Sequence, residues 1–177
     1  MISKILVALD LSANSEPMFN AAVSLAQTTG ASLMLLHVVS RSEPGYPMLP
    51  TYNYYSFVDD REYDTYQKQL AEYNERGLYF LQSLTQRAIA KGITTEHTQL
   101  TGNPGRMICQ LAANWSADLI LVGSRGLKGL KEMFLGSVSN YVSHHAPCSI
   151  LIVRTSTESA STKNHPELLT TSDETAS

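Results

Sequence analysis

Short runs of apolar residues recur along the chain and predict strands. Four runs are apolar at nearly every position, which is typical of strands buried on both faces of a parallel sheet. They cover residues 5–9, 32–39, 118–122 and 149–153. A fifth segment, residues 93–100, alternates apolar residues with threonine and histidine and predicts a more polar strand.

Apolar residues at helical spacing separate these strands. A first helix is predicted from apolar residues three and four positions apart: Phe19, Ala22, Val23 and Ala26. Ser12 and Ser15 are its candidate N-caps, Pro17 suits its first turn, and Gly30 ends it. A short helical segment over residues 137–145 precedes the last strand.

Two further helices are predicted in the middle of the chain. A long amphipathic helix begins at Tyr63 and stops at Gly92, with Gly77 as a weak point inside it. Another begins with Asn103 as N-cap and Pro104 at the first helical position.

Strands that alternate with helices predict an α/β fold, a five-stranded parallel sheet with helices on both faces. Ligands of such sheets bind at the carboxyl ends of the strands, near the point where the strand order reverses. The candidates for a binding site therefore follow the predicted strands: Asp10, residues 38–40, residues 102–105 and the residues from Gly123 onward.

Two segments lie outside this pattern. Residues 40–62 combine three prolines with several tyrosines and predict a loop. Since the usual connection has about 4–6 residues, a lid over a ligand and an insertion packed on the parent surface both stay open. Residues 155–177 are rich in serine and threonine, and we expect a disordered tail. The expected domain is residues 1–154.

Composition narrows the classes of function. A chain of 177 residues fits one domain, and 43% hydrophobic residues exclude disorder throughout. Thirteen basic and sixteen acidic residues give a net charge of -3, so we expect no nucleic-acid partner. Any bound anion must be held locally, by backbone and hydroxyl groups.

The longest apolar run, residues 33–39, is far shorter than the roughly 20 residues of a membrane span. The chain also enters a strand pattern at its start, without the regions of a signal peptide. Cys109 and Cys148 are too few for a metal framework and are interpreted as reduced structural thiols. We expect a soluble, cytoplasmic protein without a membrane partner.

Glycines cluster after the predicted strand 118–122. Gly123 and Gly126 are expected to turn the backbone through positive φ, so that successive N–H groups form an anion-binding concavity. Gly136 and Ser137 open a helix, whose N–H groups and partial positive charge suit a phosphate. The alternative is structural, because the same glycines also suit a tight strand exit and a helix entry.

These residues resemble the ending of the universal stress protein family, whose ATP-binding branch carries the pattern G-x2-G-x9-G-[ST]. The similar segments are residues 4–12, 36–39, 123–126, 135–139 and 145–153, so the resemblance covers about residues 2–154. It implies an adenine nucleotide α-hydrolase-like, Rossmann-like fold.

The resemblance also implies a ligand, an adenine nucleotide (ATP, ADP or AMP) whose phosphates carry Mg²⁺. Asp10 would contact the ribose or base region, Val38 would hold adenine through its backbone, and Gly102 would lie at the pocket wall. The residues implied around the phosphates are Gly123, Gly126, Gly136, Ser137 and Val138, with Arg125 inside the same loop.

Other interpretations of single residues stay open. Asp10 could equally help to cap the next helix. His37, inside an apolar run, is interpreted as a core histidine rather than a ligand. His144 and His145 lie near a helix end, where a cationic side chain suits the helix dipole. We favour this interpretation over a metal site, because no cysteine or carboxylate stands at a matching spacing.

The favoured function is that of a regulator or sensor in a stress response, acting through nucleotide-dependent dimer and partner interactions. An enzyme is one alternative, but the chain lacks the G-x4-G-K-[ST] motif and a recognisable catalytic set, so it would be a weak ATPase at most. A dimeric scaffold that binds no nucleotide is the other.

The predicted strand 149–153 is an apolar edge strand, which invites pairing with another chain. The resemblance implies that it pairs antiparallel with its twin across a two-fold axis. We expect a homodimer; the alternative is an internal strand covered on both edges.

Overall fold

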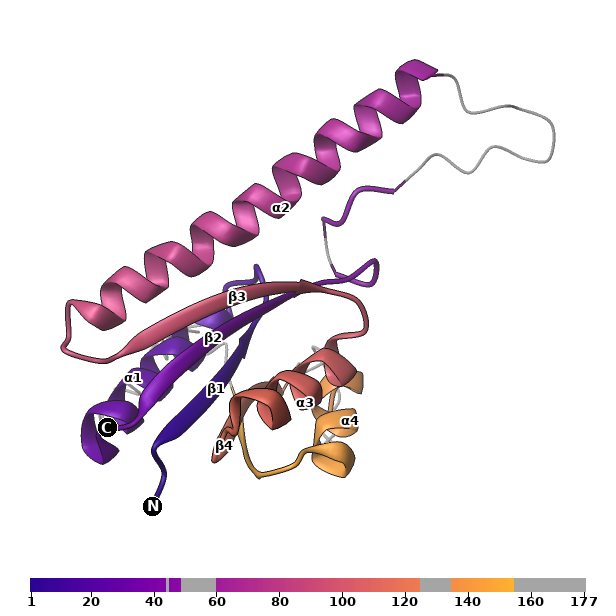
Figure 1. Cartoon of the computed structure of the whole chain (residues 1–177). Helices are drawn as coiled ribbons and strands as arrows, with labels where there is room; N and C mark the ends of the chain where they lie inside the picture. The colour runs from indigo at the N-terminus through magenta and orange to yellow at the C-terminus, as the bar shows by residue number, and fades with distance from the viewer. Residues whose placement is uncertain (44, 49–59, 125–134, 155–177) are drawn as a thin grey trace, which may run out of the picture.

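Strands and helices alternate along the chain in the computed structural model, which describes residues 1–43, 45–48, 60–124 and 135–154 (Figure 1). The elements are β1 (Lys4–Leu9), α1 (Ser15–Thr29), β2 (Ser32–Val39), α2 (Asp60–Ile89), β3 (Thr95–Thr101), α3 (Pro104–Trp115), β4 (Leu119–Ser124), α4 (Ser137–His145) and β5 (Ser149–Arg154). The expected tail at 155–177, most of the insertion at 40–62, and both Arg125 and Gly126 lie outside the described residues.

The five strands form one parallel sheet in the order β3-β2-β1-β4-β5, which confirms the predicted fold class. Val7 of β1 pairs with Leu35 of β2 on one side and with Leu121 of β4 on the other. All three side chains are fully buried. Three of the four apolar runs therefore became the central strands β2, β1 and β4, as expected for a sheet covered on both faces.

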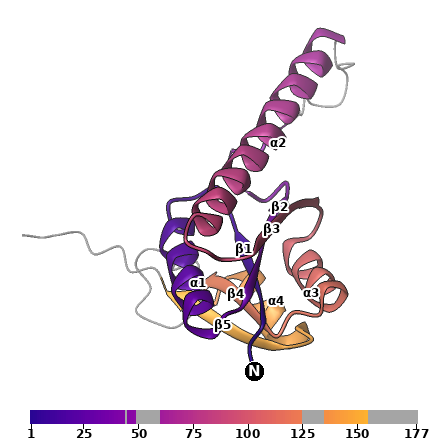
Figure 2. The same ribbon diagram turned by 60° about the vertical axis from the view of Figure 1, so that its left-hand side comes forward.

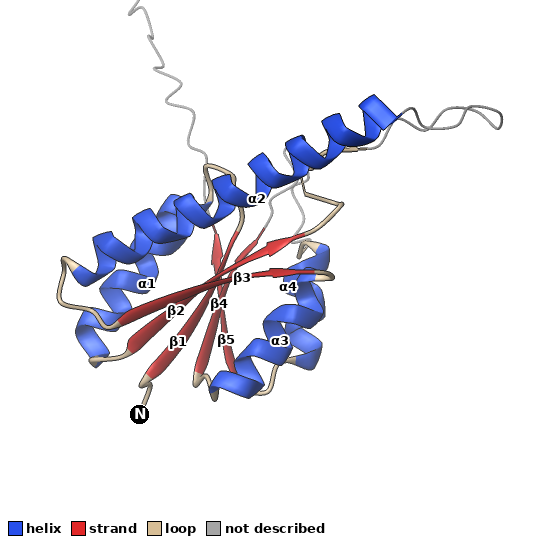
Figure 3. Ribbon diagram, turned by 45° about the horizontal axis from the view of Figure 1, so that its top comes forward, coloured by secondary structure: helices blue, strands red, loops and turns tan. Residues whose placement is uncertain are grey.

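Helices α1 and α2 cover one face of the sheet, and α3 and α4 cover the other (Figure 3). Phe19 of α1 and Leu81 of α2 belong to the core on one face. Ile108 of α3 and Val142 of α4 belong to the core on the other face. The predicted helix α3 is confirmed together with its cap, because the Asn103 side chain accepts a hydrogen bond from the Arg106 N–H.

The start of α1 differs from the prediction. Its N-cap is Asn14, and the expected cap Ser15 is the first helical residue. The Ser15 hydroxyl donates instead to the Asp10 carbonyl oxygen at 2.6 Å. The Ser12 N–H and hydroxyl both donate to the Asp10 carboxylate. The serines thus order the turn that leads from β1 into α1.

Helix α2 is the longest element, and part of it extends beyond the sheet (Figure 2). Within it, the prediction of Gly77 as a weak point was wrong. A Cβ atom at Gly77 would lie 2.7 Å from His37 Nδ1 and still closer to Gln99 Oε1. The missing side chain is what lets α2 approach β2 and β3. Among the described helices, none is both long and apolar enough to cross a membrane.

Replacing Gly77 by valine is expected to lower the free energy of unfolding by about 1–3 kcal/mol, because the new side chain overlaps the buried His37 ring. Urea denaturation measures the loss. Ser83→Val, at an exposed position of the same helix, serves as the control and should change stability by less than about 0.5 kcal/mol. Equal stability of both variants would show that α2 does not pack closely against β2 at Gly77.

Candidate functional site

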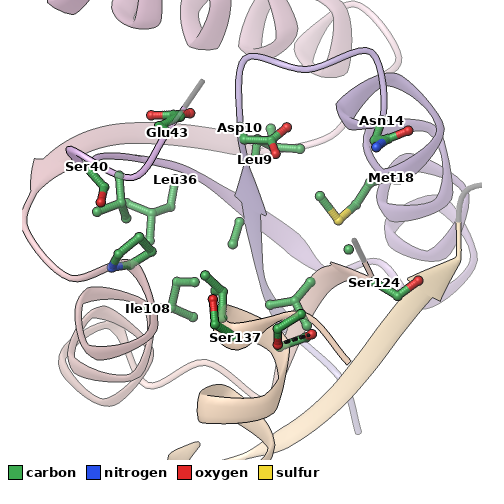
Figure 4. Close-up of a pocket in the computed structure, with 18 of the residues that line it drawn as sticks. Leu9, Asp10, Asn14, Met18, Leu36, Ser40, Glu43, Ile108, Ser124 and Ser137 are labelled. Carbon is green, nitrogen blue, oxygen red and sulfur yellow. Dashed lines mark hydrogen bonds between the residues drawn. The ribbon is translucent and has the colours of Figure 1, made fainter. Parts of the chain in front are cut away.

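A cavity opens at the carboxyl ends of β1, β2 and β4 (Figure 4). The strand order reverses here, because the chain continues from β1 to β2 on one side of β1, while β4 pairs with β1 on the other side. The cavity has a volume of about 230 Å³, just below the range of small-molecule sites, about 300–1,000 Å³. It therefore lies where doubly wound sheets bind their ligands.

The middle of the cavity is apolar. Leu36 from β2, Ile108 from α3 and Val122 from β4 line it, and each of these side chains is almost completely buried. Met18 from α1 also contributes to the lining. A flat, apolar ligand group would find van der Waals contacts on several sides here.

Asp10 lines the cavity at the end of β1 and also shapes the turn that follows. Its Oδ1 atom accepts hydrogen bonds from the Ser12 N–H at 3.1 Å, the Ser12 hydroxyl at 2.5 Å and the Ser15 hydroxyl at 3.1 Å. Asp10 thus orders the turn before α1 but does not cap the helix, whose N-cap is Asn14, and it also lines the cavity.

The end of β2 brings a second carboxylate to the cavity. Val38 lines the cavity and is followed by Ser40, Ser42 and Glu43, which line it too. The Glu43 oxygens lie 3.0 and 3.1 Å from Nε2 of His37, and the Leu11 N–H donates to Oε1 at 3.4 Å. His37 is completely buried, which confirms it as a core histidine.

Two opposing effects act on the Glu43 carboxyl. Burial alone would raise its pKa, but the hydrogen bond from His37 lowers it, and the pKa lies below the ordinary value. Glu43 is therefore ionised at neutral pH. Burial and the Glu43 carboxylate also raise the pKa of Tyr73, a buried residue of α2 whose ring lies 6.5 Å from the His37 ring between centroids.

The opposite side of the cavity is built from β4 and the start of α4. Gly136 is the N-cap of α4 and has no side chain with which to cap the helix. The first helical residues, Ser137 and Val138, line the cavity. Since the first N–H groups of a helix have no partner within it, this end presents hydrogen-bond donors and a partial positive charge.

The expected backbone conformation of Gly123 was wrong. Gly123 lies inside β4, pairs with Val153 of β5, and is not among the glycines with positive φ. Gly136 has φ -60° and ψ 159°, an extended conformation. Both glycines line the cavity, but neither does so through a left-handed turn. Gly126, the third glycine of this prediction, lies outside the described residues.

The structure brings together six of the nine residues predicted for the site: Asp10, Val38, Gly123, Gly136, Ser137 and Val138. Gly102 follows β3 and is not part of the described lining, where Pro104 appears instead. Arg125 lies outside the described residues. Sequence reasoning missed Glu43, because nothing local distinguishes it from the other polar residues of the loop.

Other chemistry is sparse in the described part of the chain. Within these residues, no group of three or more His, Cys, Asp or Glu side chains could hold a metal ion. Cys109 and Cys148 are free thiols, and burial raises the pKa of each. His145 lies in the last turn of α4, where its ring stacks on Tyr141 at 4.0 Å between centroids.

Known proteins resemble this chain in sequence. The universal stress protein family matches residues 1–154. Universal stress protein Sll1388 of Synechocystis is 37% identical over 151 residues, which cover 85% of this chain and 97% of that protein. Universal stress protein YxiE of Bacillus subtilis is 37% identical over 160 residues, which cover 87% of this chain and 100% of that protein.

Solved structures share the fold. The hypothetical protein MJ0577 superposes with a TM-score of 0.69 at 20% identity, covering 89% of this chain and 99% of that chain. A universal stress protein in complex with cAMP gives 0.61 at 24% identity, covering 88% and 98%. An Arabidopsis thaliana family member with AMP bound gives 0.59 at 22% identity, covering 91% and 97%. With the family match over residues 1–154 and two relatives above one-third identity, the chain belongs to the universal stress protein family.

Proposed function

We propose that the cavity binds an adenine nucleotide, and that the bound state of this cytoplasmic protein regulates its dimer and its partners in a stress response. The observation that carries the proposal is the polarity of the cavity. Its two ends have opposite chemistry, with an apolar zone between them. A nucleotide has the same layout, since its base and sugar lie at one end and its anionic phosphates at the other.

The base and ribose fit the end formed by β1 and β2. Leu36 and Ile108 offer apolar contact to a flat ring, and Val38, which also lines the cavity, would hold the base through its backbone. Asp10 and Glu43 offer carboxylate oxygens, which accept hydrogen bonds from hydroxyl groups.

The phosphates fit the end formed by β4 and α4. The backbone N–H groups of Ser137 and Val138 and the Ser137 hydroxyl would donate to phosphate oxygens, aided by the helix dipole. Gly102, Gly123, Arg125 and Gly126 remain part of this proposal for the same ligand. Mg²⁺, where present, would be carried by the phosphates.

A structural relative supports this choice of ligand, since it was solved with AMP bound. To test it, any nucleotide that co-purifies with the protein is identified by mass spectrometry after denaturation. Calorimetric titration of the stripped protein with AMP, ADP and ATP follows. Saturable binding with one site per chain is expected, and the absence of binding by all three would refute the proposal.

We also propose that the protein is a homodimer paired through β5. This strand is the sheet edge next to β4, and Leu151 on it is 43% exposed. An exposed apolar edge strand is a ready template for a second copy.

Leu151→Arg is expected to convert the dimer to a monomer, because two facing arginines would repel one another at the two-fold axis. Sedimentation velocity measures the change. Leu78→Arg, at another exposed leucine on α2, is the control and should leave the dimer intact. A dimer that survives Leu151→Arg would rule out pairing through β5.

A further inference from the structure

Glu43 is a fixed carboxylate rather than a mobile surface group. Its side chain is 6% exposed, and both of its oxygens lie within 3.1 Å of Nε2 of the buried His37. The other ring nitrogen of His37 lies 3.4 Å from Gln99 Oε1. Gln99 is itself held, since its amide nitrogen donates to the Asn74 carbonyl oxygen of α2 at 3.2 Å. The chain thus uses three elements to orient one carboxylate.

This orientation places Glu43 in the lining of the cavity beside Asp10 (Figure 4). The Leu11 N–H, next to Asp10 in the chain, donates to Glu43 and ties the loop after β2 to the turn after β1. Ser137 lies across the cavity from both carboxylates. The described part of the lining contains no lysine or arginine. One end of the cavity is therefore acidic, and the other carries helix N–H donors.

An ionised carboxylate only accepts hydrogen bonds. It suits the hydroxyl groups of a ribose, each of which can donate. It does not suit a phosphate, whose oxygens are also acceptors and carry the same sign of charge. A phosphate at the acidic end would lose its water without gaining a donor, which is costly in a partly buried site.

We propose that Glu43 is a specificity-determining residue, which admits nucleotides with free ribose 2′- and 3′-hydroxyls and excludes those with a phosphate on either position. This inference rests on the proposed function and adds a selection rule to it. It assigns to the buried His37 a positioning role, since His37 holds the carboxylate at the cavity wall.

The test compares three ligands by calorimetry: AMP, adenosine 2′,5′-bisphosphate and adenosine 3′,5′-bisphosphate. The wild-type protein should bind AMP at least about tenfold more tightly than either bisphosphate, the effect expected for one or two mismatched charge contacts. Glu43→Gln removes the charge while keeping the shape. It should weaken AMP binding and strengthen binding of at least one bisphosphate, so that the preference falls about fivefold or more.

Glu96→Gln, the same change at an exposed position of β3, is the matched control and should keep the wild-type preference. A gain in bisphosphate affinity cannot come from misfolding, so Glu43→Gln remains informative if it is less stable. Glu43→Asp, which keeps the charge, should retain most of the preference. Equal binding of all three ligands by the wild type, or an unchanged preference in Glu43→Gln, would overturn the inference while leaving the nucleotide site in place. Absence of all nucleotide binding would overturn both.

Discussion

Gly136→Val is expected to weaken AMP and ATP binding about ten- to a hundredfold. Gly136 is the N-cap of α4 and lines the cavity. A valine there would place two methyl groups next to the first N–H groups of the helix, where the proposal puts the phosphates. Overpacking of this kind costs about 1–3 kcal/mol, and each 1.4 kcal/mol corresponds to a factor of ten in affinity.

The fold should tolerate this substitution. With φ -60° and ψ 159°, Gly136 is in an extended conformation that valine adopts readily. Asn140→Val, one turn further along α4 and exposed, is the control for crowding on the same helix. Calorimetry on both variants, with circular dichroism to confirm the fold, measures the difference. Wild-type affinity in Gly136→Val would place the nucleotide phosphates elsewhere.

The sheet could be predicted from the sequence because a strand buried on both faces needs apolar residues at nearly every position. Residues of β2 must be apolar on either side of the strand, and residues 33–39 are apolar except for His37. The start of α3 was equally direct, since Asn103 and Pro104 each satisfy a local requirement of a helix start. These features depend on neighbours in the sequence, and sequence patterns report such neighbours well.

The predictions were wrong where the conformation or role of a residue depends on residues that are distant in the sequence. Gly123 suggested a left-handed turn, yet pairing with β5 keeps it in the strand. Gly77 suggested a weak helix, yet His37 and Gln99 from two strands occupy the space that its side chain would fill. Glu43 gave no signal, because its importance comes from His37, to which only the folded chain brings it. Site residues at the ends of strands could be predicted from the sequence. The residues that hold them in place, such as His37, could not.

His37→Ala is expected to lower the free energy of unfolding by about 2–4 kcal/mol at pH 7, because it leaves the Glu43 carboxylate buried without its main donor and opens a space under α2. This loss of stability is at the lower end of the range expected when one partner of a buried pair is removed, since Glu43 lines a cavity that water can enter. Urea denaturation measures the loss. His144→Ala, at an exposed histidine of α4, should cost less than about 0.5 kcal/mol.

The pH dependence separates the effect of the buried Glu43 carboxylate from a simple loss of packing. The pKa of Glu43 in the folded protein lies below its ordinary value of 4.5. Its ionised form therefore stabilises the fold above that pH, and the contribution is lost as the pH falls through the folded-state pKa. Without His37 the pKa of Glu43 is no longer held down, so the stability gap between wild type and His37→Ala should narrow in acid. A gap of constant size from pH 7 into the acid range would mean that His37 stabilises the fold by filling space alone.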